Sequence, residues 1–251
     1  EGSSSWEPPA GLPDVYIAMG QTAENVVQYK GVSRERMDEF AANSQQRAVA
    51  AQERGFFERE ITPITLPDGT VVSKDDGPRA GTTKEKLAEL KPVFRPDGQV
   101  TAGNACPLND GAAALVIMSD TKAAELGITP LARIVATGVS GLNPEIMGLG
   151  PIEASRQALK RAGMTIDDID LVEINEAFAA QVIPSADELG IDFDKLNVNG
   201  GAIALGHPFG MTGARITATL INGLEDAGKS IGLETMCVGG GQGMAMIIEK
   251  L

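Results

Sequence analysis

The sequence predicts an α/β fold, in which helices cover both faces of a sheet. Candidate strands alternate with candidate helices over the second half of the chain, from about residue 129 to the end. Such alternation is typical of strands joined by right-handed helical crossovers. The length of 251 residues and the 43% share of apolar residues are sufficient for a buried core. We therefore expect one α/β domain of ordinary size in this half.

The elements of this half are recognised by apolar runs that glycine, proline and capping residues delimit. Strands are expected over residues 131–139, 171–174, 231–237 and 244–248. Three helices are also expected: one with Pro151 in its first turn and Gly163 after its end, one over residues 177–189 that Pro184 would kink, and one over residues 212–227 with Ile216, Leu220 and Leu224 on one face.

The first hundred residues predict a loop-rich, helical region. Thr22 can cap a short helix that ends near Gly31, and Ser33 can cap a longer helix that Gly55 would stop. Further elements are expected in the following order: a hairpin whose turn holds Asp68 and Gly69, a lysine-rich helix over residues 83–90, a buried strand over 113–118, and a short helix from Ser119 to Gly127.

Composition excludes several classes of protein. The formal net charge of -13 provides no basic surface for nucleic acid, so no nucleic-acid partner is expected. The longest apolar run, residues 112–118, is too short to span a bilayer, and nothing near the start shows a basic segment followed by an apolar one with a cleavage site, so we expect a cytoplasmic location. Two cysteines, Cys106 and Cys237, are too few for a disulfide framework, and neither has the neighbouring cysteine and histidine ligands that a zinc site requires.

A glycine-rich segment at residues 199–213 holds the only histidine of the chain, His207. Its five glycines allow sharp turns and close approach of the backbone to a ligand. A lone histidine is usually a packing or surface residue, but His207 stands between Gly206 and Pro208, where packing needs no imidazole. Phosphate binding is the alternative interpretation. It is less favoured because neither Gly-x-Gly-x-x-Gly nor a Gly-Lys-Ser/Thr ending is present. We therefore favour a chemical function for His207.

Two further clusters follow predicted strands. Cys237 ends one strand and enters the glycine-rich turn 239–241, whose N–H groups could bind an oxyanion. Asn175 and Glu176 follow another strand and precede a helix. An inert buried cysteine and an ordinary acidic helix start are each the simpler interpretation when taken singly. Ligands of open α/β sheets bind beyond the carboxyl ends of strands, however, and both clusters fall there.

These clusters resemble the last three signatures of thiolases, in family order. They are Asn-Glu-Ala-Phe-Ala at 175–179, Asn-Gly-Gly-Ala-Ile-Ala-Leu-Gly-His-Pro at 199–208 and Cys-Val-Gly-Gly-Gly-Gln-Gly at 237–243. The resemblance implies two similar α/β halves, each with a five-stranded mixed sheet covered by helices, and an inserted loop domain. Mapped onto this chain, it implies a loop domain at 1–107, the C-terminal end of the first half at 108–128 and the second half at 129–251. Most of the first half, with the nucleophilic cysteine of the family, would be absent.

The resemblance also implies roles for four residues. His207 would act as the base for the nucleophile and donate a hydrogen bond to a thioester oxygen, and Asn175 would hold a water that completes this oxyanion site. Cys237 would move a proton on or off the α-carbon of the acetyl group. The Gly239 N–H would contribute to the oxyanion hole of the acyl-enzyme. No metal and no cofactor is expected, because coenzyme A is itself a substrate.

For coenzyme A, the family pattern implies Arg79 near the nucleotide and Met19, Phe94, Ala102 and Phe178 along the pantetheine. Two positions depart from this pattern: Ala18 replaces a histidine of biosynthetic members, and Cys106 with Pro107 replaces a serine-glycine pair that touches the pantetheine. The first departure favours a broad-substrate or degradative 3-ketoacyl-CoA enzyme.

The expected function is therefore thiolysis of a 3-ketoacyl-CoA, or the reverse Claisen condensation, with acetyl-CoA, acyl-CoA and coenzyme A as partners. The chain alone is expected to be inactive, because neither Cys106 nor Cys237 lies in the nucleophile motif. The alternative is a non-catalytic acyl-CoA-binding fragment, or a subunit that needs a partner chain. Other condensing enzymes lack this pairing of motifs. The resemblance also implies a homodimer or homotetramer.

Overall fold

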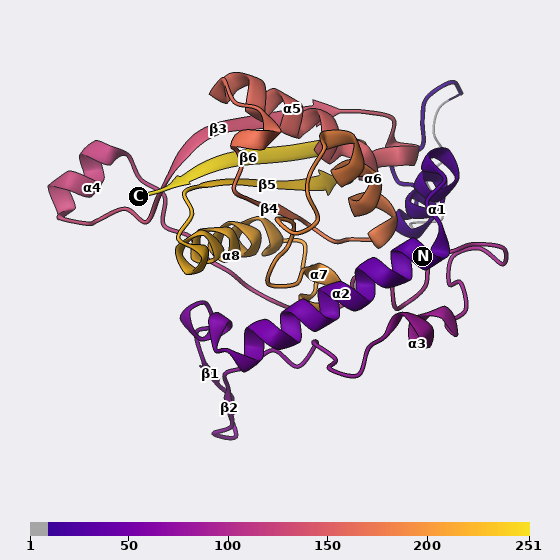
Figure 1. Cartoon of the computed structure of the whole chain (residues 1–251), viewed down its shortest axis with the longest axis horizontal. Coiled ribbons are helices and arrows are strands. Elements are labelled where there is room, and N and C mark those ends of the chain that lie inside the picture. The colour runs from indigo at the N-terminus through magenta and orange to yellow at the C-terminus, as the bar shows by residue number, and fades with distance from the viewer. Residues whose placement is uncertain (1–9) are drawn as a thin grey trace.

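A mixed four-stranded sheet forms the centre of the structure, a computed structural model that describes residues 10–251 (Figure 1). The strand order is β3-β6-β5-β4, and the last two strands are parallel while the other neighbours are antiparallel. The first nine residues of the predicted loop domain lie outside the described residues. The strands are β3 (Ala132–Gly141), β4 (Leu171–Ile174), β5 (Ile231–Val238) and β6 (Gln242–Lys250).

Helices cover both faces of this sheet, as the sequence predicted. Helix α5 (Gly150–Ala162) packs against β3, β5 and β6, and α8 (Thr212–Ala227) packs against β4 and β5 from the other side (Figure 1). Side chains of successive strand residues point to opposite faces of the sheet and therefore pack in different cores. Val172 and Ile247 belong to the core under α5, whereas Leu171 and Ile248 pack with α8.

The remaining helices of the second half lie in the connections between the strands. The 3₁₀ helix η2 (Pro144–Leu149) leads into α5, and η3 (Ile166–Asp168) precedes β4. Pro184 lies inside α6, and Gly163 and Gly190 end α5 and α6 in the left-handed conformation. The other two helices are α6 (Ala179–Leu189) and α7 (Ala202–Leu205).

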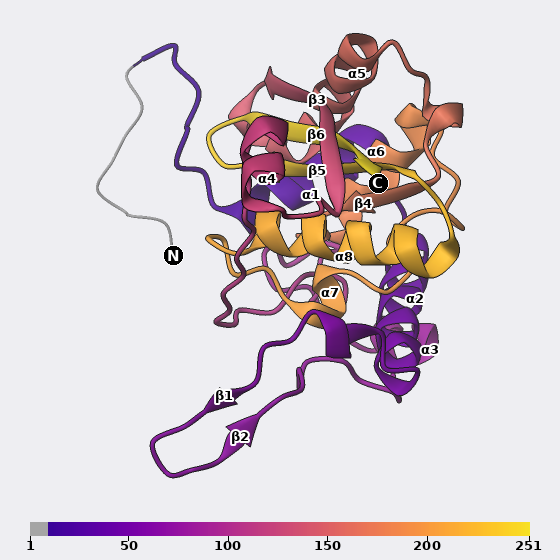
Figure 2. The same ribbon diagram turned by 90° about the vertical axis from the view of Figure 1, so that its left-hand side faces the viewer.

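The first hundred residues form a helical layer with long loops. Ser33 caps the long helix α2 through its Oγ, which accepts a hydrogen bond from the Arg36 N–H at 3.3 Å. A short hairpin projects from the body (Figure 2). The elements are α1 (Met19–Lys30), α2 (Arg34–Glu53), η1 (Phe56–Arg59), β1 (Ile64–Thr65), β2 (Val71–Val72) and α3 (Lys84–Ala88).

Three expectations from the sequence differ from the structure. Helix α1 begins at Met19 rather than at Thr22, whose hydroxyl donates to the Met19 carbonyl inside the first turn. The sheet has four strands rather than five, although a parallel bridge from Val172 to Leu196 extends its β4 edge. The predicted loop domain at 1–107 and the division at residues 108 and 129 stay predictions.

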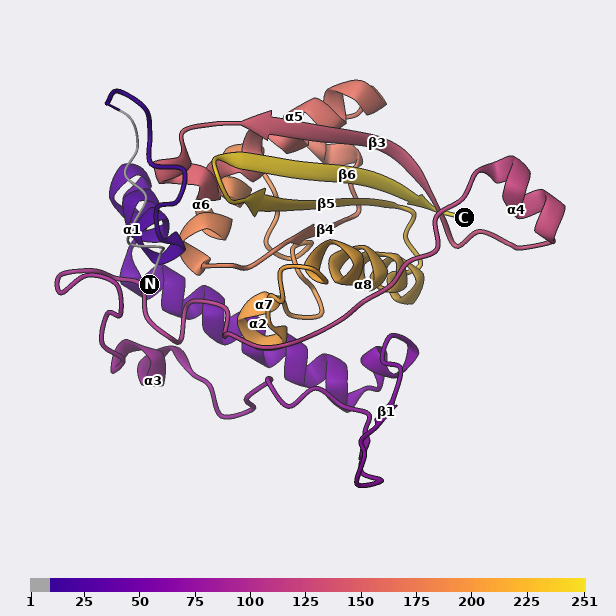
Figure 3. The same cartoon turned by 180° about the vertical axis from the view of Figure 1, so that it is seen from behind.

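The third difference concerns residues 113–118, which form neither a strand nor part of the core. Val116 is 85% exposed and Ile117 is 71% exposed. The segment runs as an extended trace towards helix α4 (Asp120–Leu126), beyond the end of the sheet (Figure 3). The prediction of a buried strand was wrong for the described residues, because no neighbouring strand pairs with this apolar run.

The burial difference predicts unequal effects of truncation. Replacing Leu233, which is fully buried in β5, by alanine should lower the free energy of unfolding by about 2–5 kcal/mol, because it leaves a cavity between sheet and helix. Replacing Ile117 by alanine should change it by less than about 0.5 kcal/mol. Urea unfolding of both variants of this chain measures the difference. An equal loss from Ile117→Ala would mean that residues 113–118 are packed in solution.

Candidate active site

The candidate site lies at the carboxyl ends of the parallel strands β4 and β5. Asn175 directly follows β4, and its N–H donates to the Thr235 carbonyl of β5 at 3.0 Å. Cys237 is the penultimate residue of β5. Two of the sequence-predicted residues are thereby placed at one edge of the sheet, where open α/β sheets bind ligands.

The Asn175 side chain is fully buried, yet its Nδ2 and Oδ1 atoms contact no hydrogen-bonding group among the described residues. Its backbone carbonyl, in contrast, accepts a hydrogen bond from Gln181 Nε2 at 2.7 Å. Buried polar atoms are hydrogen-bonded in the great majority of cases, and an unpaired one costs about 1–3 kcal/mol. The amide can therefore donate to, and accept from, a group that enters the site.

The Cys237 thiol is only 7% exposed and packs among apolar side chains. Burial, with a smaller contribution from the nearby Cys106, raises the pKa of this thiol to about 12. The thiol is consequently protonated at neutral pH and can act as a proton donor rather than as a nucleophile. The side chains that pack around it come from η2, from the segment after β4, and from α1: Met147, Ala177, Phe178 and Met19.

A tight turn after β5 holds the predicted oxyanion group. Gly241 has φ 90° and lies so close to the Leu142 carbonyl that a Cβ would collide with it. Gly239 is exposed, and no heavy atom lies within 4 Å of the position that its Cβ would occupy. Its carbonyl accepts from Gln242 Nε2 at 3.1 Å. The turn is therefore fixed at Gly241 and open to a ligand at Gly239.

His207 lies in the loop between α7 and α8. Its Nδ1 is 2.6 Å from Thr212 Oγ1, and its ring meets the Phe209 ring edge-on with centroids 5.1 Å apart. Burial lowers the pKa of the imidazole, and the positive charge of Arg215 lowers it further. The ring is therefore neutral at pH 7. Among the described residues, no hydrogen bond joins His207 to Asn175 or Cys237.

The Glu176 carboxylate, which sequence reasoning treated as a helix start, connects the end of β4 to other parts of the chain. It accepts hydrogen bonds from Ser44 Oγ at 2.6 Å, Asn197 Nδ2 at 2.8 Å and the Ile203 N–H at 3.1 Å. Burial raises the pKa of Glu176, while these three bonds act in the opposite direction. The carboxylate thus joins the end of β4 to α2 and to the loop that carries His207. One indication of this role was visible in the sequence, namely that Glu176 is an acidic residue between two apolar runs.

Four residues expected at the pantetheine lie near Cys237. The Phe94 and Phe178 rings meet edge-on at 6.0 Å, and Phe178 packs with Met19 against the Cys237 cluster. The Cys106 N–H donates to the Ala177 carbonyl at 3.0 Å. Burial raises the pKa of the Cys106 thiol to about 11. These side chains form an apolar approach to the carboxyl end of β5.

The other two expected residues are exposed. Ala102 lies in the turn that follows Thr101. The Arg79 side chain is exposed, and its N–H donates to Gln45 Oε1 at 2.8 Å. Gln45 Nε2 in turn donates to the Ile203 carbonyl at 3.1 Å, so the Arg79 backbone is fixed relative to the histidine loop.

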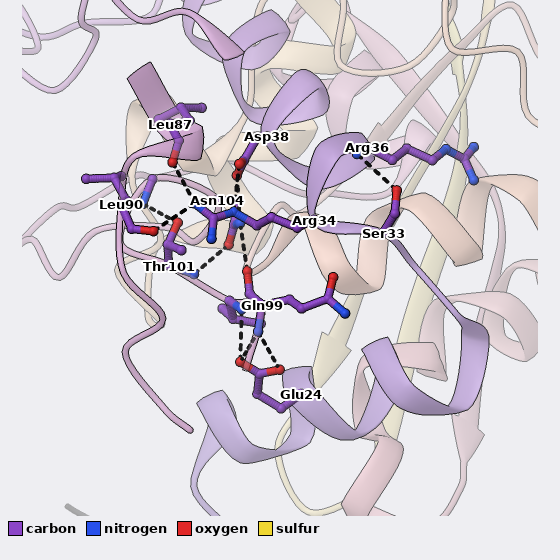
Figure 4. A network of polar contacts seen from close by, with 12 residues as sticks. Glu24, Ser33, Arg34, Arg36, Asp38, Leu87, Leu90, Gln99, Thr101 and Asn104 are labelled. Carbon is purple, nitrogen blue, oxygen red and sulfur yellow. Dashed lines mark hydrogen bonds and ion pairs between the residues drawn. The ribbon is translucent and has the colours of Figure 1, made fainter. Parts of the chain in front are cut away.

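A polar network holds the segment that carries Phe94, Ala102 and Cys106 (Figure 4). Asp38 accepts from Arg34 Nε at 2.6 Å and from Asn104 Nδ2 at 2.9 Å, while Asn104 Oδ1 accepts from the Thr101 N–H at 2.8 Å. The buried Glu24 carboxylate accepts from the Val100 N–H at 2.9 Å. Helices α1 and α2 thereby fix an irregular loop that has little regular backbone pairing of its own.

A second buried acidic cluster lies under α8, and the sequence analysis missed it. Glu173 of β4 and Glu234 of β5 are directly opposite in register, and Arg215 Nη1 lies 3.7 Å from Glu173 Oε2. Burial raises the pKa of Glu173 to about 8 and that of Glu234 to about 7. Three nitrogens of Arg215 and one oxygen of each carboxyl lack hydrogen bonds to described residues. Burial therefore keeps this carboxyl pair partly protonated near neutral pH, although a guanidinium lies beside it.

Family models match almost the whole chain. Residues 8–121 match the N-terminal domain of thiolases, and residues 128–250 match the C-terminal domain. The acetyl-CoA acetyltransferase of Allochromatium vinosum is 51% identical over 237 residues, which are 93% of this chain and 60% of the relative. A probable acetyl-CoA acyltransferase of Staphylococcus epidermidis is 50% identical over 246 residues, which are 96% of this chain and 62% of the relative.

Two solved structures share the fold. The acetyl-CoA acetyltransferase of Bacillus anthracis superposes with a TM-score of 0.92 at 52% identity, over 94% of this chain and 61% of that one. Human mitochondrial 3-ketoacyl-CoA thiolase superposes with a TM-score of 0.88 at 46% identity, over 94% and 60%. The chain therefore spans about 60% of the length of the relatives it matches.

The carboxyl pair predicts a pH-dependent stability. The ordinary pKa of a glutamate is 4.5, so the unfolded chain releases above that pH the protons that Glu173 and Glu234 retain in the folded state. The free energy of unfolding should therefore fall as pH rises from about 4.5 to 8. Replacing Glu234 by glutamine should reduce this loss by roughly 1–3 kcal/mol. Urea unfolding at pH 5 and pH 8 measures it. The control is Glu125→Gln on exposed α4, which changes the net charge equally. Identical pH slopes for both variants would contradict the retention of protons by the buried pair.

Proposed function

The chain belongs to the thiolase family, and from this premise we propose that it carries the acid/base and oxyanion groups of an acyl-CoA C-acyltransferase. The reaction is thiolysis of a 3-ketoacyl-CoA to acetyl-CoA and a shortened acyl-CoA, or the reverse condensation. The observation that carries the proposal is the meeting of Asn175 and Cys237 at the carboxyl ends of β4 and β5, beside an open glycine turn. The similarity to an acetyl-CoA acetyltransferase and to a 3-ketoacyl-CoA thiolase supports the same class of substrate.

Each residue has a chemical task in this proposal. Neutral His207 accepts the proton of a nucleophilic thiol, and Asn175 orients a water that donates to the thioester oxygen. The protonated Cys237 thiol exchanges a proton with the α-carbon of the acetyl group. The Gly239 N–H donates to the oxyanion of the acyl-enzyme. Preorganised donors of this kind make an enolate beside a thioester accessible, because they act where negative charge develops.

Neither cysteine of the chain is suited to be the acylated nucleophile. The pKa values of about 11 for Cys106 and about 12 for Cys237 leave almost no thiolate at neutral pH. We propose that the nucleophile belongs to sequence beyond these 251 residues. The chain alone would then bind acyl-CoA without turnover, which is the second candidate function. Isothermal titration with acetyl-CoA, together with an assay of free thiol release, distinguishes binding alone from catalysis.

The substrate-binding residues support a role for coenzyme A as substrate. The apolar approach formed by Met19, Phe94, Phe178 and Cys106 suits the pantetheine, and exposed Arg79 suits the anionic nucleotide end. Ala102 provides a small surface beside this approach. A degradative 3-ketoacyl-CoA substrate remains our preference because of Ala18.

Assembly and location are proposed on the same premise. We infer a homodimer or homotetramer in the cytoplasm, and exposed apolar side chains such as Leu108, Val116 and Ile117 are consistent with an additional packed surface. Across residues 10–251, none of the helices has the length and apolar character needed to cross a membrane.

The roles of the two principal residues predict different kinetic defects. In a polypeptide of the relatives' full length that contains this chain, His207→Ala should slow acyl-enzyme formation by about 10²–10⁴-fold, because the base is lost. Cys237→Ser should retain acyl transfer and lose exchange of the acetyl α-protons with deuterated water. The first step is followed by the burst of coenzyme A release, and the second by NMR of acetyl-CoA.

The control for both variants is Arg156→Gln, on the exposed side of α5. It should leave both steps unchanged. Small, equal effects of His207→Ala and Cys237→Ser on both steps would refute the division of roles, and a protein that turns over with neither residue would refute the proposed function.

A further inference from the structure

Among the described residues, only Thr212 forms a hydrogen bond to the His207 ring, at 2.6 Å between Nδ1 and Oγ1. Thr212 is fully buried and is the first residue of α8. Its hydroxyl also lies 3.0 Å from the Pro208 carbonyl oxygen. One hydroxyl thus stands between an imidazole nitrogen and a carbonyl oxygen.

The Thr212 hydroxyl decides which ring nitrogen is protonated, because it has a single hydrogen to donate. The Pro208 carbonyl can only accept, and with that hydrogen directed to it, Oγ1 accepts from the ring. Nδ1 of His207 then carries the hydrogen, and Nε2 carries the lone pair. A hydroxyl turned towards Nδ1 would give the opposite tautomer, because the Pro208 carbonyl also accepts from two N–H groups. In a neutral imidazole, the bond made by one nitrogen thereby determines the chemistry of the other.

The orientation of the ring is restricted as well. The Phe209 ring meets it edge-on at an interplanar angle of 66°, and the preceding Gly206 packs against the Asn109 amide. The backbone that leads into α8 is fixed because the Met211 and Thr212 N–H groups donate to the Pro208 carbonyl at 2.9 and 3.2 Å. Rotation of the ring would break the bond between Nδ1 and Thr212 Oγ1 and leave the buried hydroxyl with only its bond to Pro208, which is unfavourable.

We propose that Thr212 is a positioning residue that holds His207 in the Nδ1–H tautomer and so presents Nε2 as the proton acceptor. This inference deepens the proposed function and rests on it for the meaning of the base. The tautomer itself does not depend on that function. A water-exposed imidazole without such a bond would interchange its tautomers and its ring orientation, and would be a base at Nε2 for only part of the time.

The single histidine permits a direct test in the 251-residue chain. In protein labelled with ¹⁵N-histidine, two-bond ¹H–¹⁵N spectra report one ring, and the shifts of its two nitrogens show which of them is protonated. At a pH where the ring is neutral, the wild type should show a protonated Nδ1 and an unprotonated Nε2. A protonated Nε2 in the wild type would overturn the proposal.

Three variants separate the hydroxyl from mere packing. Thr212→Val keeps the shape and removes the acceptor, so the Nδ1–H form should give way to a mixture or to Nε2–H, whereas Thr212→Ser should retain Nδ1–H. The matched control is Thr217→Val in the same helix, whose hydroxyl donates to the Gly213 carbonyl at 2.7 Å instead. It should leave the tautomer unchanged. A tautomer in Thr212→Val identical to that of the wild type would refute the positioning role.

An activity measurement then distinguishes this inference from the proposed function. In the full-length polypeptide, Thr212→Val should slow acyl-enzyme formation by roughly tenfold or more, a part of the about 10²–10⁴-fold that a general base supplies, and Thr212→Ser should restore it. The KM for acyl-CoA should change little. A shifted tautomer with an unchanged acylation rate would refute His207 as the base while it upholds the tautomer. An unshifted tautomer refutes the inference alone.

Discussion

The buried carboxylate of Glu176 is the interaction on which the arrangement of the site depends. Its partners come from three separate parts of the chain: Ser44 from α2, Asn197 from the bridge at the sheet edge, and Ile203 from α7. An unpaired carboxylate in the interior would be very costly, so the three donors must be present together. Helix α2, the end of β4 and the loop that carries His207 are therefore fixed relative to one another by one carboxylate.

Close packing around this carboxylate explains the glycines of the histidine loop. A Cβ at Gly201 would collide with the Glu176 carboxylate, and the Gly201 N–H donates to Ser44 Oγ at 3.1 Å. That bond directs the Ser44 hydrogen towards Glu176. The glycine-rich sequence therefore serves the approach of backbone to a buried anion as well as to a ligand, which is why its composition alone does not identify a phosphate loop.

Local signals predicted the parts of this protein that depend on local physics. Ser33 and Gly163 mark helix ends because capping bonds and left-handed conformations involve only a few neighbouring residues.

The apolar run at 113–118 has the same local character as a core strand, but whether it forms a strand depends on a partner strand. The pairing of Glu173 with Glu234 depends on a register between strands 61 residues apart, which periodicity does not contain. Cys237 and Asn175 were found because glycine turns and strand ends are visible in sequence, whereas Thr212 was not, because its role requires a bond distance.

One physical effect prepares both proposed proton carriers. Burial disfavours the charged form of any titratable group, so it raises the pKa of the Cys237 thiol and lowers the pKa of the His207 imidazole. Each group is thereby neutral at pH 7: the thiol holds its proton and the ring lacks one. In the proposed site, an acid and a base can then coexist without an ion pair between them. Arg215 adds to this effect on His207, and the partly protonated Glu173 and Glu234 carboxyls offset its charge only in part. The same burial that stabilises the fold thus sets the protonation states of Cys237 and His207 before a substrate enters.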